Sequence, residues 1–154
     1  GTKNHDVSQN IEAFLAALPK DKPLNILDFG CGPGRDLLHF KSLGHNPTGL
    51  DGSPAFCKMA TDYSGCPTLH QTFTTMTLPF GHFDGVFANA SMFHVPSSQL
   101  LEVLQKLHDC LRPNGILFTS NPRGNAEGWQ GQRYGHYLEP ERKTNRTTTL
   151  ACYH

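Results

Sequence analysis

Asp28-Phe29-Gly30-Cys31-Gly32-Pro33-Gly34-Arg35 is the stretch of this sequence that decides the fold. It ends a short apolar run, Leu24–Phe29, which is the pattern of a buried parallel strand that leads into a loop. Glycine adopts backbone conformations that are closed to other residues and lets the chain approach a ligand closely. The stretch therefore predicts a strand, a ligand-binding turn and a helix in succession.

The same alternation continues along the chain. Apolar residues at helical spacing lie between short apolar runs, and this order indicates a parallel sheet that helices cover on both faces. The expected fold is α/β, a Rossmann-like doubly wound sheet, mostly parallel, with about five strands. The predicted strands are 24–29, 48–50, 68–70, 83–89 and 116–120, and the predicted helices are 8–18, 37–43, 54–64 and 97–111.

Hydroxyl residues just before three of the helical patterns are expected to cap them, because their oxygens accept hydrogen bonds from free first-turn amides. These residues are Ser8, Ser53 and Ser97 or Ser98. In the third predicted helix, apolar residues recur at helical spacing and are expected to face the core. This apolar stripe consists of Phe56, Met59, Ala60 and Tyr63.

A carboxylate stands at the end of the second predicted strand. Asp51 lies 21 residues after Gly30, where it can accept hydrogen bonds from both hydroxyls of a ribose. Adjacent parallel strands end at the same edge of a sheet, so the two groups predict a nucleoside-binding crevice. A dinucleotide fingerprint needs a small residue at position 35, and Arg35 stands there instead. A nicotinamide-dependent oxidoreductase therefore fits poorly.

The composition narrows the class of protein. The length of 154 residues suits one domain, and 13 basic residues balance 13 acidic ones, so binding to nucleic acid or to acidic membranes is not expected. No apolar run is long enough to span a bilayer, and no secretory signal is visible. The five cysteines match no zinc spacing. We therefore expect free thiols, a cytoplasmic location and no bound metal.

Four separate elements together resemble the class I S-adenosylmethionine-dependent methyltransferases. They are Asp28-x-Gly30-x-Gly32-x-Gly34, Asp51, Leu78-Pro79-Phe80 with Phe83-Asp84, and Leu111-Arg112-Pro113-Asn114-Gly115. The resemblance covers about residues 8–121 and implies S-adenosylmethionine as the cofactor. It also implies that the glycines wrap the methionine part, that Asp28 faces its amino group and that Asp51 holds the ribose.

In many members of that family an acidic residue contacts the adenine amino group. Thr72 occupies the matching place here, and either Gln71 could serve instead or cofactor binding could be weaker. Phe73 is expected either to pack on the adenine or to join the core. The residues that the resemblance places around the cofactor are Asp28, Gly30, Cys31, Gly32, Gly34, Asp51, Gly52, Ser53, Gln71, Thr72, Phe73 and Asn89.

A narrower likeness starts at Phe83-Asp84-Gly85-Val86-Phe87-Ala88-Asn89-Ala90-Ser91-Met92-Phe93-His94-Val95-Pro96 and continues in Ser120-Asn121-Pro122-Arg123-Gly124. These segments are similar to the methyltransferase domain of ovothiol synthases, which methylates an imidazole nitrogen of a sulfur-bearing histidine. The likeness implies a small-molecule acceptor, a mercaptohistidine or another small amino-acid derivative. The expected catalytic residues are His94, Asn89 and Ser91, and the expected acceptor-binding residues are Asn121, Arg123, Arg133 and Tyr134.

Each of these residues could instead have a structural or solvent-exposed role without a catalytic or binding function. His94 could take a proton from the acceptor, or it could only cap the loop before the next helix. Arg123 or Arg133 could grip a carboxylate, or both could be solvated loop residues. For the whole chain, the alternative function is a non-catalytic S-adenosylmethionine-binding fragment or module of a larger synthase.

The chain divides into two expected parts. Residues 1–121, with the N-terminal helix, form the S-adenosylmethionine-binding Rossmann-like domain, and residues 122–154 form an acceptor-side loop and an irregular tail. The family usually adds a hairpin beyond strand five, which we expect to be missing, because only 147–152 has strand propensity in the last stretch. Strand five or its neighbours would then expose an edge, and an exposed edge favours a homodimer.

Overall fold

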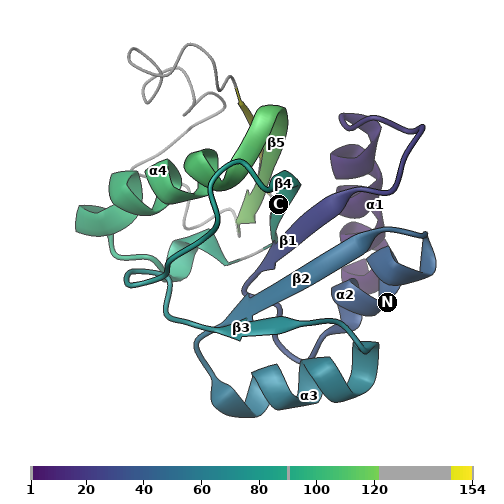
Figure 1. Ribbon diagram of the computed structural model, residues 1–154, viewed down its shortest axis with the longest axis horizontal. Helices are drawn as coiled ribbons and strands as arrows, with labels where there is room; N and C mark the ends of the chain where they lie inside the picture. The colour runs from purple at the N-terminus through teal and green to yellow at the C-terminus, as the bar shows by residue number, and fades with distance from the viewer. Residues whose placement is uncertain (1, 90, 122–146, 154) are drawn as a thin grey trace.

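Strands alternate with helices along the chain, and the computed structural model describes residues 2–89, 91–121 and 147–153 (Figure 1). The helices are α1 (Thr2–Ala16), α2 (Arg35–Ser42), α3 (Pro54–Ser64) and α4 (Leu100–Cys110), with 3-10 turns η1 (Met92–His94) and η2 (Ser97–Gln99). The strands are β1 (Asn25–Phe29), β2 (Asn46–Asp51), β3 (Thr68–His70), β4 (Phe83–Asn89), β5 (Leu111–Asn121) and β6 (Thr148–Tyr153).

The six strands form one sheet in the order β3-β2-β1-β4-β5-β6. Every neighbouring pair is parallel, so all of the strands end at the same edge. The chain winds outward from β1 to β3 and then crosses to β4, which makes the ends of β1 and β4 the switch point where such sheets bind ligands. The prediction of a doubly wound, Rossmann-like α/β sheet is confirmed.

β6 is the main departure from the predicted sheet. It pairs with β5 from Ile116 opposite Thr148 to Asn121 opposite Tyr153, so the sheet has one strand more than the five expected. β5 is hydrogen-bonded on both sides, and the outer strands among the described residues are β3 and β6. The expected exposed edge therefore lies on the neighbour β6 rather than on strand five itself. β6 runs parallel to β5, so the two do not form a hairpin.

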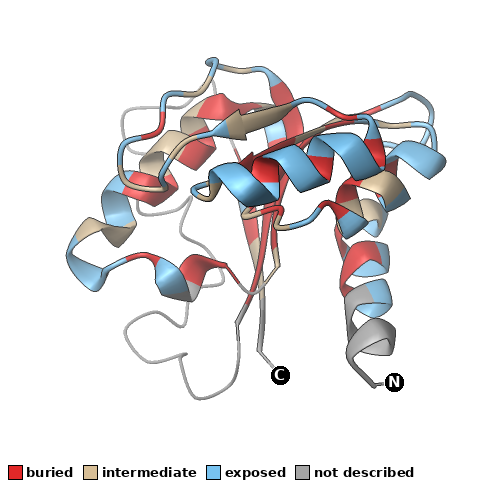
Figure 2. Cartoon of the chain, turned by 90° about the horizontal axis from the view of Figure 1, so that it is seen from below, coloured by how far each residue is buried: buried red, intermediate tan, exposed pale blue. Residues whose placement is uncertain are grey.

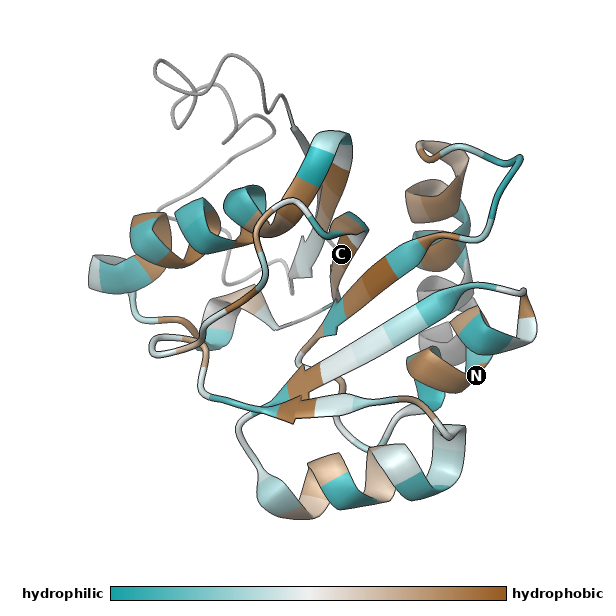
Figure 3. Cartoon of the chain, in the orientation of Figure 1, coloured by the Kyte–Doolittle hydropathy of each residue, from teal (hydrophilic) through white to brown (hydrophobic). Residues whose placement is uncertain are grey.

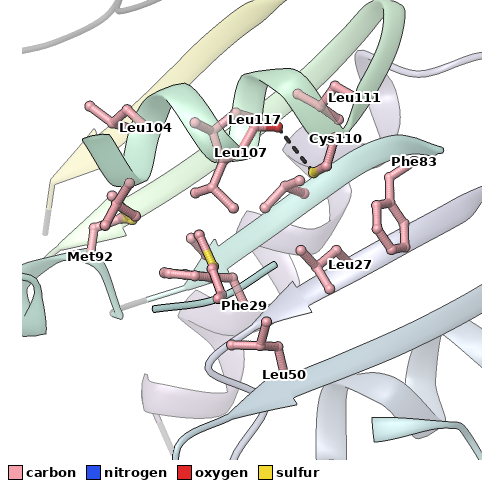
Figure 4. Close-up of a cluster of buried hydrophobic side chains, with 14 of the residues drawn as sticks. Leu27, Phe29, Leu50, Phe83, Met92, Leu104, Leu107, Cys110, Leu111 and Leu117 are labelled. Carbon is pink, nitrogen blue, oxygen red and sulfur yellow. Dashed lines mark hydrogen bonds between the residues drawn. The ribbon is translucent and has the colours of Figure 1, made fainter. Parts of the chain in front are cut away.

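The face of the sheet beneath α4 has a mainly aliphatic core. Leucines of α4 and of the strands interdigitate there, and the thiol of Cys110 donates a hydrogen bond to the carbonyl of Leu107 at 3.1 Å (Figure 4). Hydrophobic and hydrophilic residues alternate around α4, as expected for a helix with one buried face (Figure 3). The labelled members of this cluster are Leu27, Phe29, Leu50, Phe83, Met92, Leu104, Leu107, Cys110, Leu111 and Leu117.

The opposite face has an aromatic core under α1 and α2. Phe14 of α1 lies 5.9 Å from Phe40, 5.2 Å from Phe87 and 6.1 Å from Phe118, measured between ring centroids. A Cβ atom at Gly85 would lie only 2.5 Å from the ring of Phe14, so the glycine opens a slot for that ring. This slot holds α1 against β4. One turn earlier in α1, Asn10 therefore lies beside Asn89 at the end of that strand.

Two of the predicted helix caps are wrong. Ser8 lies inside α1, which begins six residues earlier, at Thr2. Before α4 the chain passes through η2, where the amide of Gln99 donates to the carbonyl of Pro96 at 2.9 Å. No side chain caps α4, because this tight turn leads directly into it.

The predicted apolar stripe of α3 is also wrong for its large members. Phe56, Met59 and Tyr63 are 42%, 49% and 57% exposed, and α3 presents much of its surface to solvent in Figure 2. The helix instead buries small residues, of which Ala60 packs against the glycine turn. A Cβ atom at Gly34 would lie 2.8 Å from the Cα of Ala60, so only a small residue fits between the two backbones.

Candidate functional site

The glycine turn after β1 is held in shape by backbone hydrogen bonds. The amides of Gly30 and Cys31 both donate to the carbonyl of Leu50 in β2, at 2.8 and 3.0 Å. Gly30, Gly32 and Gly34 have φ angles of 80°, 53° and 97°, in the left-handed region that other residues rarely adopt. The sequence folds this way because the turn must reverse tightly from β1 into α2 while it remains bonded to β2.

Each glycine of the turn has a different neighbourhood. A Cβ atom at Gly30 would meet Ser91 at 2.9 Å and Phe73 at 3.3 Å, and Gly34 is closed off by α3. A Cβ atom at Gly32 would have nothing within 4 Å among the described atoms. Gly32 therefore presents bare backbone at the open side of the turn, which is the side where a ligand can approach.

Asp51 joins the glycine turn to the end of β2. One carboxylate oxygen accepts a hydrogen bond from the amide of Gly32 at 2.9 Å, and the other accepts from the amide of Ser53 at 2.9 Å. Ser53 caps α3 as predicted, because its hydroxyl accepts from the amide of Phe56 at 3.2 Å. Two amides thus fix the orientation of Asp51, and each oxygen keeps a further lone pair for a ligand hydroxyl.

Asp28 has the least favourable surroundings for a charged carboxylate in the site. It lies at the end of β1, is 3% exposed, and its Oδ2 atom has no hydrogen-bond partner. Burial raises the pKa of this carboxyl well above its usual range, and the nearby carboxylates of Asp36 and Asp51 raise it further. A buried acceptor without a donor is costly, so the position fits a ligand that brings a cationic donor.

Cys31 lies beside these acids. Burial raises the pKa of its thiol to about 12, and the charge of Asp28 adds to the effect. The sulfur packs close to Gly49, where a Cβ atom would lie 2.7 Å away. Cys31 is therefore a neutral packing residue of the turn, since a nucleophilic cysteine needs a lowered pKa.

The segment after β3 forms a compact loop beside the glycine turn. Gln71 accepts a hydrogen bond from the amide of Thr77 at 2.9 Å, and the hydroxyl of Thr72 is paired with that of Thr75. Phe73 stacks on Phe29 with ring centroids 4.1 Å apart. The side chain of Phe73 thus packs on the core and also reaches the rim at Gly30, so both predicted roles remain compatible with its position.

Gly52 contacts the end of β3 through its backbone. Its carbonyl lies 3.2 Å from Nε2 of His70 at the end of β3. The strand ends of β2 and β3 are therefore tied together next to Asp51. The predicted cofactor residues from Asp28 to Phe73 lie along the adjacent ends of β1, β2 and β3.

The predicted catalytic residues follow β4 and differ in their surroundings. Ser91 is buried, and its hydroxyl donates to the carbonyl of Phe29 at 2.8 Å. Asn89 accepts a hydrogen bond through Oδ1 from the side-chain amide of Asn10 at 2.9 Å and another from the hydroxyl of Ser120. His94 is exposed, on η1. The structure thus brings all three to the end of β4, where Ser91 is buried, Asn89 is half-buried and His94 is exposed.

Two residues of this region were not predicted from the sequence. Asn10 is 7% exposed on α1 and reaches Asn89 across 79 positions of the chain. Asp36 lies in the first turn of α2, close enough to Asp28 to raise the pKa of that carboxyl. A polar residue on the apolar face of the α1 pattern was a usable signal for Asn10. The position of Asp36 two residues after Gly34 was a usable signal for an acid near the turn.

Several predicted residues lie outside the described part of the chain. Arg123, Arg133 and Tyr134 belong to residues 122–146, for which the structure gives no description. Asn121 is described only through its backbone, which pairs β5 with β6. The predicted boundary between a domain and an irregular tail at residue 121 therefore remains a prediction, although Thr148–Tyr153 of the predicted tail form the regular strand β6.

The described residues contain neither a candidate metal site nor a candidate membrane span. No group of three or more His, Cys, Asp or Glu side chains there is placed to hold a metal ion. Among the same residues, none of the helices has both the length and the apolar character that a membrane span requires.

The fold and the site together define a class of protein: a doubly wound α/β domain with a glycine turn at the end of β1, a carboxylate at the end of β2 and a buried carboxylate oxygen that has no hydrogen-bond partner among the described residues. The family described as "Methyltransferase domain" matches residues 26–115, which include the glycine turn, Asp51 and β4. The chain belongs to this family, the class I S-adenosylmethionine-dependent methyltransferases, and its cofactor is S-adenosylmethionine.

The curated relatives include two proteins that are named as methyltransferases. The chain is 33% identical over 112 residues to trans-aconitate 2-methyltransferase of Rhodopseudomonas palustris (strain BisB18), covering 71% of this chain and 43% of that protein. It is 27% identical over 128 residues to malonyl-[acyl-carrier protein] O-methyltransferase of Pseudescherichia vulneris, covering 79% and 50%. The chain thus spans about half the length of the curated relatives that it matches.

Solved structures support the same fold. The 1,6-didemethyltoxoflavin-N1-methyltransferase of Burkholderia thailandensis, crystallised with S-adenosylhomocysteine, is 27% identical with a TM-score of 0.53. The match covers 61% of this chain and 43% of that one. An S-adenosylmethionine-dependent methyltransferase of Mesorhizobium loti is 25% identical with a TM-score of 0.59, covering 68% and 49%. Each match thus covers more than half of this chain and less than half of the solved structure.

Proposed function

We propose that this chain is part of an enzyme that methylates a small molecule, and that the acceptor is the imidazole nitrogen of a mercaptohistidine, as in ovothiol biosynthesis. The observation that carries the methyltransferase function is the buried Oδ2 atom of Asp28, which has no partner and lies beside the glycine turn. The narrower acceptor rests on the likeness of residues 83–96 to the methyltransferase domain of ovothiol synthases.

The residues of the turn fit S-adenosylmethionine. Asp28 would bind its amino group, the open backbone at Gly32 would lie along its methionine part, and Asp51 would accept from its ribose hydroxyls. When bound, the cofactor supplies a methyl group that is activated by the sulfonium charge. Gln71 or Phe73 would border the adenine beside β3.

The loop after β4 would hold the acceptor. An imidazole nitrogen attacks with its own lone pair, so the protein must orient the acceptor, exclude water and remove a proton. His94 is exposed at this rim and would take that proton. Asn89 and Ser91 would position the loop, because their side chains are already bonded to neighbouring elements. Arg123, Arg133, Asn121 and Tyr134 remain the proposed acceptor-binding residues.

The proposed partners rest on the charge balance of the chain and on the outer edge of β6. We propose a small-molecule acceptor and no nucleic acid, because basic and acidic residues balance at 13 each. The outer edge of β6 would pair with a second copy of the chain, since unpaired strand edges recruit other strands. Light scattering at increasing protein concentration tests this homodimer, and a constant monomer mass would contradict it.

We also propose a cytoplasmic location. All four cysteines whose surroundings are described, Cys31, Cys57, Cys66 and Cys110, are free and buried. Free thiols are typical of reducing compartments. Fractionation of cells that express the tagged protein tests the proposal, and recovery in a secreted fraction would contradict it.

A non-catalytic S-adenosylmethionine-binding module is the second candidate. One observation favours it: the chain covers 43% and 50% of the first two relatives, while its cofactor turn and strand ends are fully formed. A module of this kind would bind the cofactor tightly and leave acceptor chemistry to other parts of a larger protein.

Calorimetric titration tests the cofactor site. S-adenosylmethionine and S-adenosylhomocysteine are expected to bind, and NAD is not, because Arg35 occupies the third-glycine position of a dinucleotide turn. Asp51→Ala should weaken cofactor binding by roughly 1–3 kcal/mol through the loss of charged hydrogen bonds. Tight binding of NAD, or an unchanged affinity in Asp51→Ala, would overturn this assignment.

A methylation assay separates the two candidate functions. The protein is incubated with S-adenosylmethionine and either 4-mercaptohistidine, histidine or nucleic acid, and methylated products are followed by mass spectrometry. Methylation of 4-mercaptohistidine alone supports the proposed acceptor. Cofactor binding without turnover of any acceptor supports the module. Methylation of nucleic acid would contradict both.

A further inference from the structure

The end of the sheet where β1 and β2 begin lies opposite the glycine turn (Figure 1). A cavity of about 250 Å³ is found there, which is smaller than the roughly 300–1,000 Å³ of pockets that hold drug-sized ligands. Its size therefore suits a small molecule or one functional group of a larger molecule. The lining side chains that carry nitrogen atoms are Asn25, Lys41, His45, Asn46 and His82.

The lining of this cavity favours a negatively charged ligand. It includes the ammonium group of Lys41 and the imidazole rings of His45 and His82. None of the described residues that line the cavity is acidic. Nitrogen donors and a positive charge that share one cavity with no carboxylate in its wall attract an anion.

Asp84 is an acid close to this end of the sheet, and its charge is balanced by two cations. Its carboxylate accepts a hydrogen bond from the amide of Asn25 at 2.9 Å. The same carboxylate pairs with Lys22 at 3.4 Å and with Arg112 at 3.3 Å. Two cations around one carboxylate leave an excess of positive charge, so Asp84 does not oppose an anion in the cavity.

The ammonium group of Lys41 is held at the wall of the cavity. Its Nζ atom donates a hydrogen bond to the carbonyl of Ser64 at 3.3 Å, which uses one of its three N–H groups and leaves two for a ligand. A Cβ atom at Gly65 would lie only 2.8 Å from this Nζ atom. The absence of a side chain at Gly65 therefore gives the ammonium its place.

The ring of His45 is oriented by the backbone. Its Nδ1 atom accepts a hydrogen bond from the amide of Leu24 at 3.1 Å, so the neutral ring carries its proton on Nε2. Burial lowers the pKa of this imidazole, although the nearby carboxylate of Asp84 acts in the opposite direction. At neutral pH, His45 therefore offers one N–H donor, at Nε2, in the cavity that Lys41 also lines.

We propose that this cavity binds a phosphate group, either as a phosphate monoester or as the free ion, through the ammonium of Lys41 and the Nε2 donor of His45. A lysine binds phosphate as a point charge, and the several oxygens of a phosphate accept from donors on different elements. A planar carboxylate is matched best by the paired donors of an arginine, and no described lining residue is an arginine. The site is separate from the glycine turn and does not depend on the proposed function.

NMR titration of the isotope-labelled protein at constant ionic strength tests this site. Inorganic phosphate and glycerol 3-phosphate should shift the backbone amide signals around Lys41, His45 and Gly65, with a dissociation constant on the order of 1 mM. Acetate, a planar anion, should not shift them at the same concentration. Tighter binding of glycerol 3-phosphate supports a monoester as the ligand, and tighter binding of inorganic phosphate supports the free ion.

Two variants and a matched control separate this site from a general attraction of anions. Lys41→Met removes the charge and should weaken phosphate binding by about tenfold or more. His45→Asn keeps an acceptor for the amide of Leu24 but removes the Nε2 donor, so binding should weaken by about fivefold. Lys58→Met removes an exposed lysine of α3 that is not part of the lining, and it should leave the affinity unchanged.

Four outcomes would overturn the inference. They are equal weakening by Lys41→Met and Lys58→Met, equal binding of acetate and phosphate, signal shifts confined to the glycine turn, and no saturable shift with either phosphate. Because the titration uses no cofactor and no methyl acceptor, a failed methylation assay would leave its result unaffected.

Discussion

The two sides of the site are built by different means. The cofactor side, residues 28–34 and 51–53, is held by backbone hydrogen bonds between neighbouring strands and carries the carboxylates. The proposed acceptor side, at residues 89 and 91, is held by side-chain hydrogen bonds to other elements: Asn10 of α1 donates to Asn89, and the hydroxyl of Ser91 donates to the carbonyl of Phe29. One side carries carboxylates and is local in sequence, whereas the other depends on contacts between distant parts of the chain.

This difference explains how one fold can serve many acceptors. A side that is made of backbone and glycine keeps its shape when most side chains change, so it binds a constant ligand. A side that is made of long-range side-chain contacts changes with each substitution, so it adapts to the acceptor. The following predictions test whether the two sides of this protein are as separate as their construction indicates.

Gly34→Ala should have the largest effect. Its Cβ atom would lie 2.8 Å from the Cα of Ala60, and the residue has a φ of 97°, so overpacking and backbone strain add to about 4 kcal/mol of lost stability. Gly32→Ala is the matched control, since its Cβ has open space and should cost only about 1 kcal/mol. Urea unfolding of both variants gives the comparison, and equal losses would contradict it.

Gly32→Ala should weaken cofactor binding although it costs little stability. Its loss of cofactor affinity should exceed that of whatever fraction of Gly34→Ala still folds. A methyl group at Gly32 would enter the open side of the turn, where the ligand approaches. Calorimetry with S-adenosylhomocysteine should therefore show a loss of at least about tenfold in affinity. Unchanged affinity would mean that the ligand does not lie along this glycine.

His108 should make the packing of α4 against β6 sensitive to acid. It is buried on α4 between the hydroxyls of Thr147 and Thr149, and burial lowers its pKa to about 4. The unfolded imidazole titrates near ~6.5 and binds more protons, so stability present above that pH is lost as the pH falls toward 4. The loss attributable to this histidine is about 3 kcal/mol.

Urea unfolding of the wild type and of His108→Gln between pH 7 and pH 4 measures this effect. The difference in stability between the two proteins should shrink as the pH falls, because only the wild type must keep a buried imidazole neutral. His82→Gln, at an exposed histidine, is the control and should follow the wild type. A difference that is independent of pH would show that His108 does not titrate in this way.

Asn10→Ala should act on the acceptor side alone. The substitution removes one of two donors to Asn89, which should cost about 1 kcal/mol of stability. The affinity for S-adenosylhomocysteine should change by less than about twofold, because the glycine turn does not depend on this contact. Glu12→Ala, at an exposed site of α1, provides the baseline. A large loss of cofactor affinity in Asn10→Ala would show that the two sides are energetically coupled.

Asp62→Asn should have the smallest effect. The pair with Lys58 spans 3.0 Å, but its side chains are 65% and 78% exposed, so the change in stability should be about 0.5 kcal/mol or less. Thermal unfolding at low and high salt checks this value. A larger loss would mean that α3 depends on surface charge more than on its small buried residues.

The cofactor side could be predicted from the sequence because its determinants are local. Glycines within five residues, a carboxylate at a strand end and a serine before a proline each have a direct backbone meaning. The acceptor side could not be predicted to the same depth. The contact between Asn10 and Asn89 depends on how α1 crosses the sheet, and periodicity alone does not contain that information.

The failure at α3 has a different physical cause. Phe56, Met59 and Tyr63 follow helical spacing and indicate a buried stripe, yet the backbone of the glycine turn lies too close for large side chains. A requirement for small residues at a close contact overrode the hydrophobic pattern. The sequence did not predict β6 as a strand of the sheet. Its six weakly apolar residues have only a modest strand propensity, and they form a strand because they pair with the edge of β5.

The pairing of β6 with β5 has a consequence for how the protein is made. A ribosome delivers the chain from the amino end, so β5 emerges before residues 147–153 exist, and its outer edge waits without hydrogen bonds. Parallel strands cannot close through a tight turn, and the intervening residues 122–146 must be synthesised before the partner arrives. During that interval the nascent sheet is open to pairing with a neighbouring chain on the same polysome, so the rate of translation through this stretch sets how long the hazard lasts.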